Sequence, residues 1–81
     1  MKSEFMLEAI REAEKSLASG DVPVGAVIVK DGEIISRAYN MREAGPSATA
    51  HAEICAVEQA CKKLKTRRLS GCEMYVTLEP C

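Results

Sequence analysis

A histidine, a glutamate and a distant cysteine are the residues of this sequence best suited to chemistry. One residue separates His51 from Glu53, and Cys81 follows Pro80 at the last position. Imidazole nitrogens and thiolate sulfurs are common zinc ligands in proteins, and a carboxylate held near them can carry a proton. These side chains therefore predict a metal site with an acid–base residue beside it.

Both candidate ligands are expected near the beginnings of helices. Proline is favoured at the first helical position, so Pro80 predicts a helix that holds Cys81 in its first turn. Free N–H groups and the positive end of the helix dipole favour a thiolate there. His51 is expected at the start of an earlier helix, with Thr49 or Ser47 as the cap. Two helix starts would then present an imidazole and a thiolate to one ion.

The first elements that must position these residues are a helix and a hairpin. The helix is expected over residues 4–19, whose apolar side chains recur at helical spacing. These side chains are Met6, Ile10, Ala13 and Leu17. Two β-branched runs then meet at Asp31-Gly32, a pair that favours a tight hairpin turn. Residues 24–29, apolar on both faces, are expected to form a central strand covered by helices.

The second helix and a third strand complete the predicted order. Residues 41–50 are expected to form a loop because they contain glycine, proline and serine. The helix that begins at His51 carries one apolar stripe. This stripe consists of Ile54, Val57, Cys61 and Leu64. A turn at Ser70-Gly71 leads into the last strand, and the order α-β-β-α-β predicts a sheet with helices packed on its faces.

Composition limits the class of protein. The chain has 81 residues and a formal net charge of −1, so we expect one domain over residues 1–81 and no DNA partner. No apolar run approaches the roughly 20 residues that a membrane span needs, and we expect no membrane partner. Acidic residues interrupt the apolar positions near the N-terminus, unlike in a signal peptide. We therefore expect a cytoplasmic protein.

Several of these residues have a second interpretation. Cys55 lies four residues after His51, on the same helical face, and so forms a rival metal pair. We prefer to interpret Cys55, Cys61 and Cys72 as small buried groups. Asn40 is suited to ending the second predicted strand at a turn. This interpretation is as plausible as the binding role that the resemblance described below implies.

A basic cluster lies near the end of the second predicted helix. Its members are Lys62, Lys63, Lys65, Arg67 and Arg68. Such a run is most often a solvated helix end favoured by the helix dipole, and contact with phosphate groups is the alternative.

The motifs together resemble a known family. His51-Ala52-Glu53 followed by Pro80-Cys81 is similar to the H-x-E…P-C part of the zinc deaminase signature. The stretches VPVGAVIV, TAHAE, RRL and YVTLEPC occur in the order typical of bacterial tRNA-specific adenosine deaminases. The sequence resembles the N-terminal half of such a protein, because the second cysteine of P-C-x-x-C would fall three residues beyond Cys81. The resemblance implies a cytidine-deaminase-like α/β/α sandwich whose later strands and helices are missing.

The resemblance also implies roles for individual residues. His51 and Cys81 would bind zinc, Glu53 would transfer protons, and Asn40 would hydrogen-bond the base. The implied reaction converts adenosine to inosine in the anticodon stem-loop of tRNA, and the implied assembly is a homodimer. With two of three zinc ligands, we expect this segment alone to be inactive. Two alternatives stay open, namely a guanine or other free-base deaminase on the same fold and a non-catalytic fragment.

Overall fold

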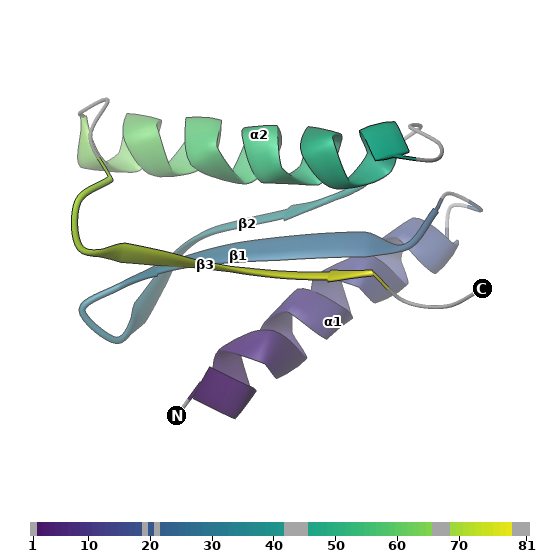
Figure 1. Cartoon of the computed structure of the whole chain (residues 1–81), viewed down its shortest axis with the longest axis horizontal. Helices are drawn as coiled ribbons and strands as arrows, with labels where there is room; N and C mark the ends of the chain where they lie inside the picture. The colour runs from purple at the N-terminus through teal and green to yellow at the C-terminus, as the bar shows by residue number, and fades with distance from the viewer. Residues whose placement is uncertain (1, 19, 21, 42–45, 66–68, 79–81) are drawn as a thin grey trace.

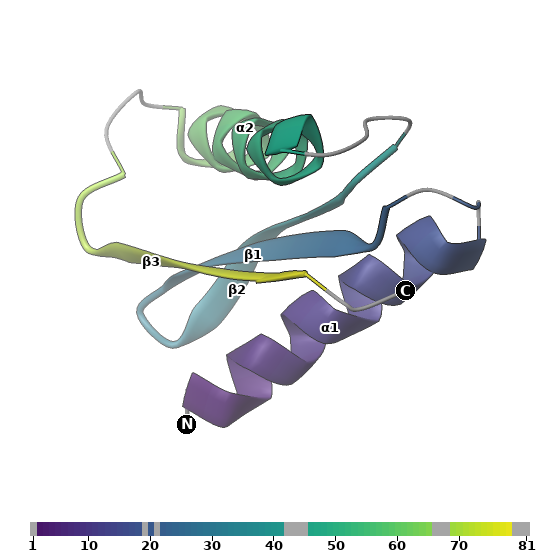
Figure 2. The same ribbon diagram turned by 45° about the vertical axis from the view of Figure 1, so that its right-hand side comes forward.

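In the part of the chain that the structure describes, two helices enclose one sheet of three strands. The computed structural model describes residues 2–18, 20, 22–41, 46–65 and 69–78. The elements in chain order are α1 (Lys2–Ala18), β1 (Val24–Lys30), β2 (Glu33–Tyr39), α2 (Pro46–Leu64) and β3 (Cys72–Leu78). α1 covers one face of the sheet and α2 covers the other (Figure 1; the turned view in Figure 2 agrees). The predicted α-β-β-α-β order and the layered α/β/α arrangement are confirmed.

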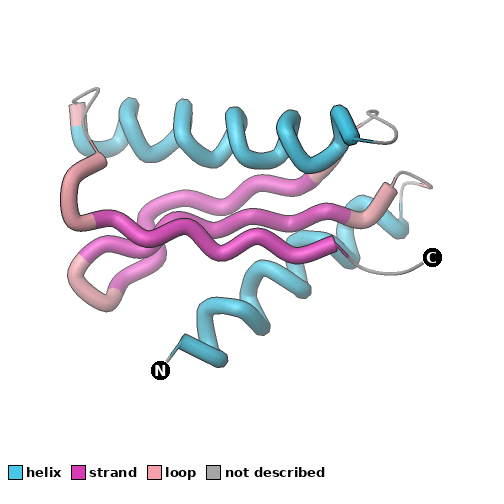
Figure 3. The backbone as a smooth tube through the Cα atoms, viewed as in Figure 1, coloured by secondary structure: helices cyan, strands magenta, loops and turns pink. Residues whose placement is uncertain are grey.

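β1 is the central strand, as predicted. The strand order is β2-β1-β3, and both pairs are antiparallel. The tube in Figure 3 shows the three strands side by side in one layer between the two helices. Residues 24–29 are all buried because neighbouring strands pair with both edges of β1 while helices cover both of its faces. This double burial explains why the run carries no polar side chain.

The hairpin turn also forms where the sequence predicts it. Asp31 and Gly32 both have positive φ angles, of 52° and 77°, as a tight turn between right-twisted strands requires. The pairing of β1 with β2 shifts register between Ile28 and Val29. This irregularity is the kind that increases the local twist of a hairpin.

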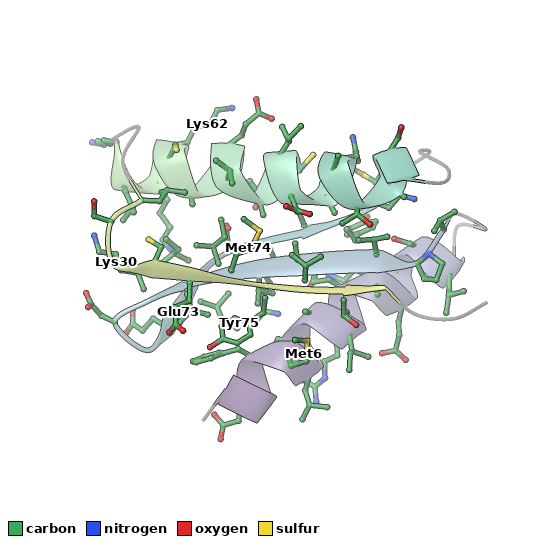
Figure 4. All side chains as sticks on the ribbon, viewed as in Figure 1. Met6, Lys30, Lys62, Glu73, Met74 and Tyr75 are labelled. Atoms are coloured by element: carbon green, nitrogen blue, oxygen red, sulfur yellow. The ribbon has the colours of Figure 1, made fainter. Side chains whose placement is uncertain are left out.

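Side chains of β1 alternate between two cores, as the period of a strand requires. Val24, Ala26 and Ile28 belong to the core under α2, whereas Val27 and Val29 belong to the core under α1. β3 follows the same rule. Met74 and Tyr75 point to opposite sides of the sheet (Figure 4), and the ring of Tyr75 lies 5.5 Å from the ring of Phe5.

α2 begins earlier than predicted. Its first residue is Pro46, so the predicted loop is wrong for residues 46–50. Ser47 and Thr49 lie inside the helix and do not cap it. Proline is favoured at the first helical position because its missing N–H has no partner to lose there, and that signal applies to Pro46 as it does to Pro80.

The buried face of α2 also differs from the prediction. The fully buried residues of α2 are alanines spaced four apart, and Cys55 and Val57 pack against the same core while staying partly exposed. The alanines are Ala48, Ala52, Ala56 and Ala60. Ile54, from the predicted stripe, is 58% exposed, and the other three stripe residues are only partly buried. Small side chains occupy the buried face because they let the helix backbone approach the sheet closely. The hydroxyl of Ser36 on β2 uses that proximity to donate a 2.9 Å hydrogen bond to the carbonyl of Ala56.

α1 shows the same preference for small residues. Of its predicted stripe, Met6 and Leu17 are largely exposed, while Ala13 is fully buried. The buried residues of α1 are Ala9, Glu12, Ala13 and Ser16. The predicted stripe is therefore wrong at both ends. The helix packs through small residues and Glu12, and Phe5 also packs against the core under α1.

Ion pairs connect α1 to β2. Arg37 of β2 donates a 2.6 Å hydrogen bond to a carboxylate oxygen of Glu8, and this bond lowers the pKa of Glu8. The buried carboxylate of Glu12 lies 3.0 Å from the Nζ of Lys15 and 3.7 Å from Arg37. A buried acid is tolerated here because two cations lie beside it.

Among the described residues, no helix is long and apolar enough to cross a membrane.

α1 packs closely against the sheet at Gly25. A methyl group there would collide with the carbonyl oxygen of Ala9 and lie 2.5 Å from the backbone nitrogen of Ala13. Backbone atoms cannot swing aside, so Gly25→Ala must push α1 away from β1. We expect a loss of about 3 kcal/mol or more in the free energy of unfolding, measured by urea denaturation.

Gly32→Ala is the matched control for that substitution. Gly32 has a positive φ angle but nothing near its added carbon, so only local strain of about 1 kcal/mol is expected. Equal losses in the two variants would contradict the close approach of α1 to Gly25.

Candidate metal site

His51 lies in the second turn of α2 and is partly buried. The prediction that it begins the helix is wrong, because the helix starts at Pro46. The free N–H groups of the first turn belong to residues before the histidine. Its position is set instead by the alanine face of α2, since Ala52 beside it is fully buried against the sheet.

Cys55 is the nearest sulfur to this histidine in the part of the chain that the structure describes. Its Sγ lies 3.7 Å from the Nε2 of His51, because residues four apart share one face of a helix. Cys55, Cys61 and Cys72 are all free and partly buried. The three cysteines are therefore less buried than the preferred interpretation expects, and Cys55 contacts His51, as the rival interpretation expects. The four-residue spacing was the signal that indicated this pair.

Glu53 follows His51 by two residues and is also partly buried. Residues two apart on a helix do not face each other, so the carboxylate projects in a different direction from the imidazole. Glu53 therefore does not share the helical face of His51 and Cys55. Its assignment as a proton carrier stays a prediction.

Asn40 is fully buried at the end of β2, where it connects three segments. Its side-chain amide donates a 2.8 Å hydrogen bond to the carbonyl of Val22, and its backbone N–H bonds to the carbonyl of Val24. Its own carbonyl accepts a 2.8 Å bond from the hydroxyl of Ser16. These bonds fit the interpretation of Asn40 as a residue that ends the strand. Its predicted contact with a base stays a prediction.

Two of the predicted site residues, Pro80 and Cys81, lie outside the described residues. Within the described ranges, no group of three or more His, Cys, Asp or Glu side chains is placed to hold a metal ion. The donors that are placed, an imidazole and a thiol 3.7 Å apart, have the chemistry that zinc favours. The residues present therefore fit a zinc site in part.

The basic cluster lies at the end of α2. Lys62 and Lys63 occupy its last turn, and Lys65, with a φ angle of 55°, follows the helix. All three lysines are exposed, and Lys62 projects away from the sheet (Figure 4). Arg67 and Arg68 are not among the described residues. Cations at this end of a helix interact favourably with its dipole, which fits the interpretation as a solvated helix end.

A hollow on the described surface lies elsewhere, between α1 and β2. It measures about 500 Å³ and includes Phe5, Ile34 and Arg37 in its lining. None of the predicted site residues lines it. A base bound near His51 would therefore occupy a separate site on the α2 side.

Comparison with known proteins finds relatives of the kind that the sequence motifs resemble. The chain is 55% identical over 80 residues to a tRNA-specific adenosine deaminase of Aquifex aeolicus, covering 99% of this chain and 53% of that protein. A solved tRNA:A34 deaminase, studied for A-to-I editing at the wobble position, matches with a TM-score of 0.82 and 44% identity, covering 99% of this chain and 62% of its own.

A guanine deaminase of Bacillus subtilis is a further structural neighbour. It matches with a TM-score of 0.78 and 40% identity, covering 98% of this chain and 51% of its own. The chain spans about half the length of the curated relatives it matches.

The family assignment is given by a family model for the cytidine and deoxycytidylate deaminase zinc-binding region, which matches residues 1–81. That match covers every helix and strand described above, together with the H-x-E and P-C motifs. The chain therefore belongs to the cytidine and deoxycytidylate deaminase family.

Proposed function

We propose that this chain forms the zinc-binding part of a deaminase that converts adenosine to inosine at the wobble position of tRNA. The observation that carries the proposal is the 55% identity to a tRNA-specific adenosine deaminase over almost the whole chain. The placement of His51 and Glu53 on one helix supports it, because a ligand and a proton carrier must be held in fixed relation.

The proposed chemistry divides between the ion and the protein. Zinc, when bound, supplies a water activated for attack at C6 of adenine. His51 and Cys81 are the proposed ligands. Glu53 would accept a proton and pass it to the ring nitrogen and to the departing ammonia. The products are inosine and ammonia.

Further assignments complete the proposal. Asn40, whose side-chain amide also donates to the carbonyl of Val22, would hydrogen-bond the base. A homodimer in the cytoplasm, with tRNA as its partner, is proposed from the resemblance to tRNA-specific deaminases. The guanine deaminase neighbour, at 40% identity, makes free guanine the second candidate substrate.

A chimera tests the proposed role of Glu53. Residues 1–81 would replace the matching segment of the Aquifex aeolicus relative, and inosine formation would be measured on an anticodon stem-loop, with ammonia release from free guanine as the comparison. We expect the Glu53→Gln chimera to keep its zinc and lose turnover by about 100-fold or more, because an amide cannot carry the proton.

Asp31→Asn is the control, since it removes an acid in the hairpin turn, away from α2. Loss of zinc from the Glu53→Gln chimera would make Glu53 a ligand and contradict its proposed role. A folded, zinc-loaded chimera that acts on guanine and leaves the stem-loop unchanged would contradict the tRNA substrate.

The exposed lysines at the end of α2 give a second test in the same chimera. If they bind phosphate groups of tRNA, replacing Lys62, Lys63 and Lys65 with alanine should reduce the slope of log affinity against log salt. The expected reduction is about 0.7 to 0.9 for each phosphate group that a lysine no longer neutralises, with the preference for the target adenosine unchanged. Filter binding over a range of salt concentrations measures the slope.

Lys30→Ala, a lysine outside the cluster, serves as the control. An unchanged slope in the triple variant would leave these lysines as a solvated helix end that does not touch RNA.

A further inference from the structure

The contact between His51 and Cys55 is not used by the proposed ligand set. The Sγ of Cys55 and the Nε2 of His51 are 3.7 Å apart on one face of α2. His51 is the single histidine of the chain. A metal that binds through the Nε2 of this histidine would therefore bind beside this thiol.

The spacing matches that of two ligands on one ion. Zinc bonds of about 2.3 Å to sulfur and about 2.0 to 2.1 Å to nitrogen, at a tetrahedral angle, separate the two donor atoms by about 3.6 Å. The observed separation is 3.7 Å. An ion can thus bridge the two atoms without a change of helix geometry.

The surroundings also favour binding at this face. Both side chains are partly buried, so an ion can reach them from solvent and still lose part of its water shell. The neighbouring Ala52 and Ala56 are fully buried against the sheet, which holds this stretch of α2 in place. Cys61, six residues after Cys55 on the same helix and also partly buried, has no histidine to act with it.

We propose that His51 and Cys55 form a two-residue site for zinc or a similar thiophilic divalent cation. Binding displaces the thiol proton to water and completes the coordination with water molecules. The site shares His51 with the proposed deaminase ligands but does not depend on Cys81. The proposed site depends on the helix geometry of α2, so it can be tested separately from the proposed reaction.

Cobalt(II) is the probe, because its thiolate complexes absorb in the near ultraviolet and its d–d bands report tetrahedral coordination. The 81-residue chain would be titrated under reducing conditions as the wild type and as Cys55→Ser, Cys61→Ser and Cys81→Ser. We expect Cys55→Ser to lose the thiolate band and to bind cobalt about tenfold more weakly or worse. Cys61→Ser, the matched control on the same helix, should behave as the wild type.

The outcomes separate this site from the proposed deaminase ligands. Loss of the band in Cys55→Ser, whether or not Cys81→Ser also weakens it, supports the pair. Loss in Cys81→Ser with none in Cys55→Ser overturns the pair and leaves the proposed ligand set standing. Absence of a thiolate band in the wild type, or equal loss in Cys61→Ser, also overturns it.

A second measurement avoids substitution and so cannot be confused by misfolding. Alkylation of the wild-type thiols, with and without zinc, would be followed by mass spectrometry. We expect zinc to slow alkylation of Cys55 several-fold more than that of Cys61 or Cys72. Equal slowing of the three thiols would contradict the pair.

Discussion

Close packing of two helices on the central strand β1 is the constraint on which the rest of the structure depends. α1 passes over Gly25, and α2 lies on the sheet through Ala48, Ala52, Ala56 and Ala60. In both cases the helix meets the sheet through the smallest side chains. Bulkier residues at these places would hold the helices farther from the sheet, and the hydrogen bond from Ser36 to the carbonyl of Ala56 would break.

This packing decides where the chemical groups lie. With the alanine face of α2 fixed on the sheet, the directions in which His51 and Glu53 project follow from the helical repeat. Cys55 is brought to 3.7 Å from His51 by the same repeat. At the end of β2, Asn40 joins this strand to the start of β1 and to α1 through the hydroxyl of Ser16. The candidate site is therefore a product of the sheet and its two helices, not of one local motif.

Much of the architecture could be predicted from the sequence, because its signals are local. Asp31-Gly32 specifies a turn by itself, and the unbroken apolar run of β1 indicates a strand covered on both faces. The combination of His51-Ala52-Glu53 with the distant Pro80-Cys81 and the stretches around them was enough to indicate the family.

The helix faces could not be predicted in the same way. A stripe of large apolar residues normally marks the buried side of a helix, yet Ile54 is mostly exposed and alanines are buried instead. Which face of the helix is buried depends on how closely the helix can approach the sheet. That distance is set by tertiary packing and not by the local sequence. The burial of Asn40 is likewise set by partners from 18 to 24 residues away in the chain. The start of α2 was missed for a different reason, since Pro46 carried a local signal that the glycine and serine around it obscured.

Native-state hydrogen exchange, followed by NMR for each amide of the chain, tests the dependence of the site on this packing most directly. If α2 is held by its alanine face on β1, amides of residues 48–60 and of β1 should exchange slowly and through one shared opening. Their apparent opening free energies should then agree and fall together as urea is added. Rapid exchange along α2 while β1 stays protected would contradict the account, because the helix that carries His51 and Glu53 would then open independently of the sheet.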